Sequence, residues 1–314
     1  MSFSSEVKEE LSNHVSSPRH CQIAEMAAII HNCGKISVDK VGKNELVIQT
    51  ENLFVARKCF TLLRKTFNIN TDIIEKVGSK QLKGKAYSIR LKDETEIEKV
   101  LQAIKVMRPD GTLCDDLECV NAVVIKNSCC KRAFLRGTYL AIGSMSDPEK
   151  SYHLEFVCTS ERQALQLTGI IADFDIEARV VMRKKYHVVY MKEGAAVVDL
   201  LNIMEAHVSL MNMENFRILK EMRNSINRKV NCEAANITKT VTAASRQVQN
   251  IELIQKKYGF KNLPDNLREV AELRLDNPDV SLKELGELLS PPVGKSGVNH
   301  RLRKLSELAD KLRA

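Results

Sequence analysis

Residues 129–143 read CCKRAFLRGTYLAIG, and residues 20–34 read HCQIAEMAAIIHNCG. In both stretches apolar residues recur at the spacing of one helix face, and a glycine, Gly34 or Gly143, ends the run. We therefore expect two equivalent helices, each capped by a glycine in the left-handed conformation. Small residues that would let the two helices pack closely are Ala27, Ala28, Gly137 and Ala141.

The sequence after each of these helices follows a common plan. LVIQT at residues 46–50 corresponds to LEFVCT at residues 154–159. Short alternating strands lie in hairpins between helices, a pattern that favours antiparallel sheets with helices on one face over parallel winding. The sequence predicts an α+β domain over residues 1–216 that consists of two repeats, at about 15–107 and 125–205.

The last third of the chain has a different pattern, with few strand signals. We expect a connector over residues 205–230 and an all-α domain over residues 217–314. Its helical patterns, which prolines separate, lie at residues 232–258, 267–276, 281–289 and 296–312.

Positive charge is concentrated in this last third. Lys and Arg outnumber Asp and Glu by 19 to 12 in residues 217–314, whereas the counts are 29 and 28 in residues 1–216. Such asymmetry indicates an anionic partner, with nucleic acid first and a membrane surface second. The other interpretation is a basic domain without such a partner.

A helix-turn-helix pattern occupies residues 280–313. Ser281 and Glu284 have the spacing of a capping box at the start of its first helix. A Pro-Pro pair then forces a turn, and Ser296 is expected to cap the second helix. The alternative is a plain helical bundle with a charged, solvated face.

The second helix of this pattern has an apolar face and a basic, hydrogen-bonding face, and residues 288–306 contain no acid. In a helix-turn-helix the second helix lies in the major groove, where Asn can pair with adenine and Arg with guanine, while Lys suits phosphate. Double-stranded DNA is the expected partner. The candidate DNA-binding residues are Lys295, Ser296, Asn299, His300, Arg301, Arg303 and Lys304.

The sequence contains no motif for metal binding, catalysis or a cofactor. The nine cysteines form no Cys-x-x-Cys pair, and Cys129 and Cys130 are adjacent, so we expect reduced thiols and no metal site. No phosphate loop or Ser/His/Asp arrangement is found, so no catalytic residue and no cofactor are expected. Neither a signal peptide nor an apolar run of membrane-span length occurs, which predicts no membrane partner and a cytoplasmic, nucleoid-associated location.

Four stretches resemble one known family. FLRGTYLAIGSMSDP at residues 134–148, KSGVNHRL at 295–302, RNSINR at 223–228 and SSEVKEEL at 4–11 are similar to the WhiA family of bacterial regulators. The resemblance covers essentially the whole chain. It implies a LAGLIDADG homing-endonuclease-like domain followed by a helix-turn-helix DNA-binding domain. It also implies a role in cell division, chromosome segregation or sporulation rather than catalysis.

Homing endonucleases cleave DNA with a divalent metal, so the comparison concerns the residues that would bind this metal. Their signature helices end in an acid followed by glycine, and the two acids hold a divalent metal between the halves. In this sequence Cys33 and Ile142 precede the two glycines, and neither offers a hard oxygen ligand. The nearest acids, Asp39 and Asp147, lie beyond the predicted helix ends. We therefore expect a degenerate nuclease scaffold.

The leading hypothesis is a non-enzymatic DNA-binding protein that regulates transcription. The alternatives are a scaffold whose first domain binds a partner protein, and an active endonuclease. The sheets of that domain could contact DNA, present solvated lysines or bind a protein. Their basic residues are Lys76, Lys80, Lys83, Lys85, Arg179, Arg183, Lys184 and Lys185.

Overall fold

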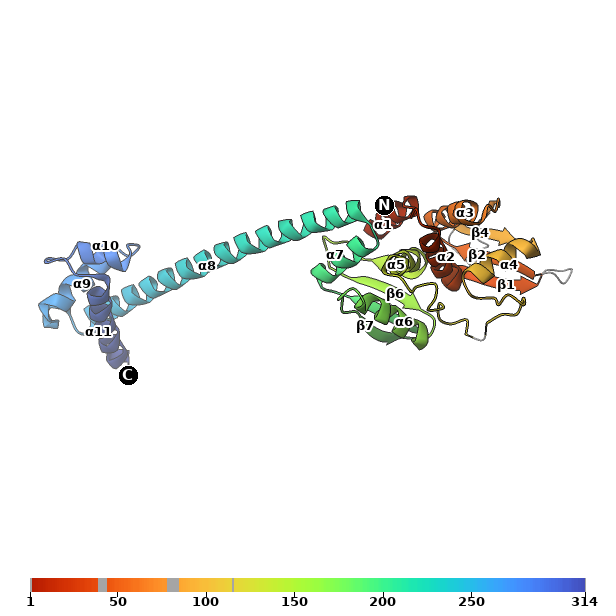
Figure 1. The fold of residues 1–314 in the computed structure, drawn as a ribbon. Coiled ribbons are helices and arrows are strands. Elements are labelled where there is room, and N and C mark those ends of the chain that lie inside the picture. Colours follow the sequence, from red (N-terminus) through yellow and green to blue (C-terminus); the bar gives the residue numbers. More distant parts are fainter. Residues whose placement is uncertain (1, 39–43, 78–84, 115, 314) are drawn as a thin grey trace. The chain divides into compact units, whose positions relative to one another are not determined.

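The computed structural model describes residues 2–38, 44–77, 85–114 and 116–313. The chain divides into two compact units, residues 1–219 and 220–314 (Figure 1). Each unit has its own hydrophobic core. Each is described by itself below.

The first half of unit 1 contains a four-stranded antiparallel sheet in the order β1-β2-β4-β3. Helices α3 and α4 pack against the central strands β2 and β4. The elements of this half are α1 (Phe3–Asn13), α2 (Arg19–Cys33), β1 (Gly34–Val38), β2 (Asn44–Thr50), α3 (Leu53–Phe67), β3 (Ile73–Val77), β4 (Lys85–Leu91) and α4 (Glu94–Ala103).

The second half repeats this plan with a four-stranded antiparallel sheet in the order β5-β6-β8-β7. The duplicated α+β fold predicted from the sequence is therefore confirmed. The elements of the second half are α5 (Ser128–Ile142), β5 (Gly143–Met145), β6 (Leu154–Cys158), α6 (Glu161–Ala172), β7 (Arg179–Arg183), β8 (Tyr186–Met191) and α7 (Gly194–Ile203).

Helices α2 and α5 lie side by side at the centre of unit 1 (Figure 1). Their approach is close enough to require a glycine. A Cβ atom at Gly137 would lie 2.5 Å from the carbonyl oxygen of Glu25 and 2.8 Å from the Cβ of Ala28. Both distances are shorter than van der Waals contact, so the small residues of these helices set their spacing.

Gly34 and Gly143 end the two central helices, but not in the conformation expected. Gly34 has φ −86° and ψ 146°, and Gly143 has φ −81° and ψ 150°, so both are extended. The prediction of left-handed caps is wrong because strands β1 and β5 begin directly at these residues. Glycine is needed for space instead: a Cβ would lie 2.5 Å from the Ile30 oxygen at Gly34 and 2.4 Å from the Tyr139 ring at Gly143.

Helix α8 (His207–Lys257) includes most of the segment that the sequence predicted as a connector, so that segment is helical, and the division between the two units, after residue 219, falls within it. The sequence offers the reason. Residues 207–257 contain no glycine and no proline, and nothing in the polar run at 223–229 breaks a helix. The remaining elements of the chain are a short 3₁₀ helix (Phe260–Asn262), α9 (Asp265–Asp276), α10 (Leu282–Glu287) and α11 (Lys295–Arg313).

Candidate nucleic-acid interface

Helices α10 and α11 and the turn between them form the predicted helix-turn-helix. At the start of α10 the Ser281 hydroxyl accepts a bond from the Glu284 amide, and the Glu284 carboxylate accepts one from the Ser281 amide at 2.8 Å. The predicted capping box is confirmed. These hydrogen bonds lower the pKa of the Glu284 carboxyl because they favour its charged form.

The turn closes tightly over α10 at Gly286. The Val293 amide donates to the Gly286 carbonyl at 2.9 Å. A Cβ at Gly286 would lie 2.0 Å from the Val293 oxygen and 3.0 Å from a methyl carbon of Val298. Only glycine therefore permits this approach of α10, the turn and α11. Sequence reasoning missed this residue, although a glycine inside a helical pattern is a recognisable signal.

Helix α11 begins earlier than expected, at Lys295. The amides of Gly297 and Val298 donate to the Gly294 carbonyl at 2.9 and 3.2 Å, so Gly294 occupies the N-cap position. The prediction that Ser296 caps the helix is wrong, because the turn enters helical geometry before that residue. Ser296 is an exposed residue of the first turn.

The apolar face of α11 is buried in the core of unit 2. Val298 and Ala309 are fully buried and Leu302 and Leu305 nearly so. They share the core with residues of α8, α9 and α10, among them Ile254, Val270, Ala271 and Leu285. This packing fixes which side of α11 faces solvent.

The opposite face of α11 carries the candidate residues. Ser296, Asn299 and His300, and Arg303 one turn further, follow the spacing of one helix face. Six of the candidates are exposed and lie on the first half of the helix: Lys295, Ser296, Asn299, His300, Arg303 and Lys304.

Two arginines of this helix are held differently. Arg301 is half-buried, and its guanidinium donates to the Asn266 carbonyl at the start of α9 at 3.4 Å. Arg303 is exposed, and its Nε contacts the Glu307 carboxylate at 3.2 Å. An exposed ion pair one helical turn apart contributes about 0.3–0.5 kcal/mol, so Arg303 can leave it at little cost.

A buried arginine positions the segment that leads into α10. Arg274 donates to the Gln247 side chain at 3.0 and 2.9 Å and to the Val280 carbonyl at 2.7 Å. Burial lowers the pKa of this guanidinium. Sequence reasoning missed Arg274, because nothing in the local pattern of α9 marks one of its arginines as buried.

In unit 1, α2 ends in a cysteine, Cys33, and α5 ends in an isoleucine, Ile142. Burial raises the pKa of the Cys33 thiol to about 11 and lowers that of the nearby Lys8 ammonium to about 8. Ile142 is apolar, and Asp147 is exposed and accepts a bond from the Glu149 amide at 3.0 Å. Asp39 lies outside the described residues.

Three of the basic side chains that the structure describes on the sheets are paired with acids. Lys85 contacts Glu75 at 2.8 Å, and Arg179 contacts Glu177 at 3.4 Å. Arg183 contacts Glu155 at 2.8 Å. Lys80, Lys83 and the side chain of Lys76 lie outside the described part of the chain. These pairs reduce the positive potential that the sheets could offer to DNA.

A duplicated LAGLIDADG-like domain followed by a helix-turn-helix module is the class of protein that this fold defines. The chain matches the WhiA N-terminal LAGLIDADG-like domain over residues 19–107, the WhiA LAGLIDADG-like domain over 131–223 and the WhiA C-terminal HTH domain over 226–309. The chain belongs to the WhiA family.

Known relatives match the chain along its full length. The "Probable cell division protein WhiA" of Lachnoclostridium phytofermentans is 54% identical over 100% of both chains. That of Alkaliphilus oremlandii is 46% identical over 99% of this chain and 98% of the relative. The crystal structure of full-length WhiA from Thermatoga maritima is similar with a TM-score of 0.59, at 25% identity and 99% coverage of both chains.

Among the described residues, no helix is both long and apolar enough to cross a bilayer.

Proposed function

We propose that the chain is a DNA-binding regulator of transcription that acts in bacterial cell division and catalyses no reaction. The observation that carries this proposal is the exposed, acid-free face on the first half of α11, opposite a fully packed apolar face. Cell division is the process in the relatives' name. Chromosome segregation and sporulation are further processes that we propose for such a regulator.

The roles on this face follow from side-chain chemistry. Asn299 and Arg303 suit base edges, as bidentate partners of adenine and guanine. Lys295 and Lys304 suit phosphates, and Ser296 lies where the amides of the first turn also favour a phosphate. His300 lies between them as a further hydrogen-bonding group. Arg301 donates one N–H to the Asn266 carbonyl, and its guanidinium has further donors that suit a phosphate.

The absence of catalysis is inferred from the two central helices. Two-metal cleavage of a phosphodiester needs hard oxygen ligands, which a thiol and an isoleucine do not provide. At this place the chain has Cys33 and Ile142, with the Lys8 ammonium close to the thiol. A cation so close to the thiol also repels a divalent metal.

Salt titration of the full-length chain tests the proposal. Binding of duplex DNA, measured by fluorescence anisotropy, should weaken steeply as salt rises. Lys304→Ala should reduce the slope of log affinity against log salt by about 1, because one phosphate contact is lost. Lys311→Ala, which removes an equal charge near the other end of α11, should leave the slope unchanged. Affinity that does not respond to salt contradicts the proposal.

One observation favours the scaffold as a second candidate. All five residues of the edge strand β7 are exposed, and Val180, Val181 and Met182 among them are apolar. An exposed apolar edge suits a protein partner better than DNA. Met182→Glu in the full chain should then impair cell division while DNA affinity stays unchanged. Normal division in cells that carry this variant would remove the candidate.

A further inference from the structure

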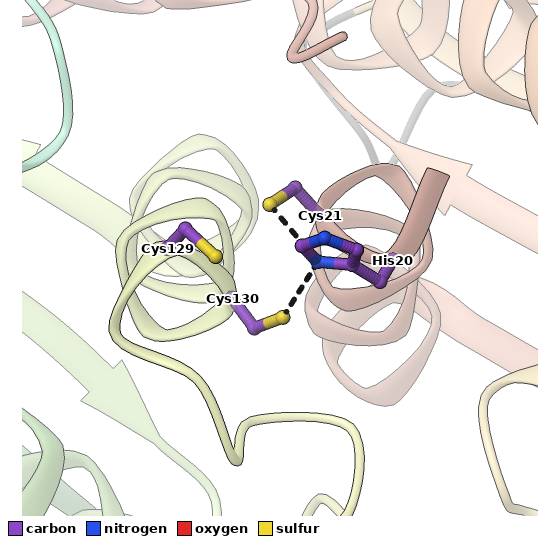
Figure 2. A group of neighbouring side chains, drawn as sticks. All are labelled: His20, Cys21, Cys129 and Cys130. Atoms are coloured by element: carbon purple, nitrogen blue, oxygen red, sulfur yellow. Dashed lines mark hydrogen bonds between the residues drawn. The ribbon is translucent and has the colours of Figure 1, made fainter. Parts of the chain in front are cut away.

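Four potential metal ligands converge between the first turns of α2 and α5 (Figure 2). They are His20, Cys21, Cys129 and Cys130. Each helix contributes two adjacent residues from equivalent positions, the second and third of the helix. The duplication of the domain therefore brings together two pairs that lie far apart in the sequence.

We propose that these four side chains form a binding site for one zinc ion that clamps α2 to α5. The site lies at the start of both helices, whereas Cys33 and Ile142 lie at their far ends. It is thus separate from the place where the homing endonucleases hold their metal. A set of three thiolates and one imidazole is a preferred structural zinc environment.

The distances fit tetrahedral coordination. The ligand atoms all lie within 4.8 Å of one another. His20 Nδ1 is 3.2 Å from the Cys130 sulfur and 3.4 Å from the Cys21 sulfur. In a tetrahedral site with the usual Zn–S and Zn–N bonds, ligand atoms are about 3.6–3.8 Å apart. The four atoms therefore need to move by about 1 Å or less.

The electrostatic environment favours such an ion. Neither α2 nor α5 has a side-chain cap, and the four ligands lie in the first turn of these helices, at their positive ends. A zinc ion with three thiolates and a neutral imidazole carries one net negative charge, which two helix N-termini stabilise. Cys21 and Cys130 are buried, while His20 and Cys129 are exposed and leave a path from solvent.

Binding exchanges protons for the ion. Crowded thiols resist ionisation because their negative charges would repel, and a cation between them removes that repulsion. One zinc ion displaces three thiol protons and coordinates the neutral imidazole, so charge and atoms balance.

Cobalt titration of the tag-free, full-length chain under reducing conditions tests the site. One equivalent of Co²⁺ should produce the visible bands of tetrahedral cobalt and a thiolate-to-cobalt charge-transfer band, and Zn²⁺ should then displace it. Cys130→Ser should abolish the bands. Cys232→Ser, which removes an exposed thiol of α8 outside the cluster, should leave them unchanged.

A second variant guards against loss of the fold. His20→Asn keeps every thiol and alters an exposed residue, so its circular dichroism should match the parent chain. It should weaken Zn²⁺ affinity at least about tenfold, as expected for the loss of one ligand. Zinc should also raise the Tm of the parent chain but not that of Cys130→Ser.

Two results would overturn the proposal. The first is metal uptake that is absent or equal in the parent chain and in folded His20→Asn and Cys130→Ser. The second is a disulfide between the helices, detected as a mass loss of two hydrogens on mild oxidation, in protein that binds no Zn²⁺ when reduced.

Discussion

Glu25 on α2 is fully buried and binds two buried cations. Its carboxylate contacts Lys58 Nζ and Arg136 Nε, each at 2.9 Å, and both of these side chains are also inaccessible to solvent. Arg136 further donates to the Ser16 hydroxyl at 2.6 Å and to the Glu205 carboxylate. Burial lowers the pKa of Lys58, which the charge of Glu25 opposes. This carboxylate therefore compensates charges from α3 and α5.

Glu25→Gln should destabilise unit 1 strongly, because it leaves the buried Lys58 without its carboxylate partner and Arg136 with Glu205 alone. Breaking a buried ion pair costs about 3–5 kcal/mol of the free energy of unfolding. The control is Glu75→Gln, whose pair with Lys85 is exposed to solvent and therefore contributes little to stability. Urea unfolding followed by circular dichroism measures both. Equal, small losses in the two variants would contradict this account of Glu25.

At the scale of elements, the close packing of α2 and α5 depends on Gly137. Gly137→Ala should destabilise the chain by about 1–3 kcal/mol, because the added methyl meets the Glu25 carbonyl and Ala28. Gly169→Ala is the matched change on α6, where nothing lies within 4 Å of the new atom. It should stabilise by about 0.5–1 kcal/mol, through helix propensity and a less flexible unfolded chain.

The comparison of these two variants by urea unfolding separates packing from propensity. If both alanines stabilise the chain, the two central helices have room to separate, and the close approach is not a constraint. If both destabilise equally, the effect does not come from the contact between α2 and α5.

Elements with a strong local pattern could be predicted from the sequence. The periodicity of residues 20–33 and 129–142 predicts α2 and α5, and the capping box of Ser281 and Glu284 predicts the start of α10. The predictions were wrong where the adjoining strand or turn determines the backbone conformation. Gly34 and Gly143 are extended because a strand follows at once, and Gly294 replaces Ser296 as cap because of the turn before it.

Long-range sites could not be predicted. Neither His20–Cys21 nor Cys129–Cys130 has the sequence spacing of a known metal-binding motif. The two pairs come together only because the domain is duplicated. The buried partners of Glu25 come from two other helices, α3 and α5, and no local pattern marks Lys58 or Arg136 as buried. The candidate DNA-binding residues could be proposed from the sequence because they lie on a single helix.

At the scale of the whole molecule, one unit carries a nuclease-like scaffold and the other the basic helix. The full-length chain should therefore leave supercoiled plasmid DNA intact in the presence of Mg²⁺ or Mn²⁺, because Cys33 and Ile142 supply no oxygen ligand. Gel electrophoresis of the plasmid measures this. Nicking that depends on the metal and disappears in Asp147→Ala would show that a nearby acid serves instead.

Sequence-specific recognition by α11 is the central claim, and one measurement tests it most directly. The full-length chain is used to select binding sites from random duplex DNA, and the affinity for the selected site is then compared with that for a scrambled site. Arg303→Ala should lose about 1–3 kcal/mol on the selected site, with relaxed preference at one base pair, while Lys311→Ala should keep that preference. Equal losses in both variants, or no selected sequence at all, would contradict the claim.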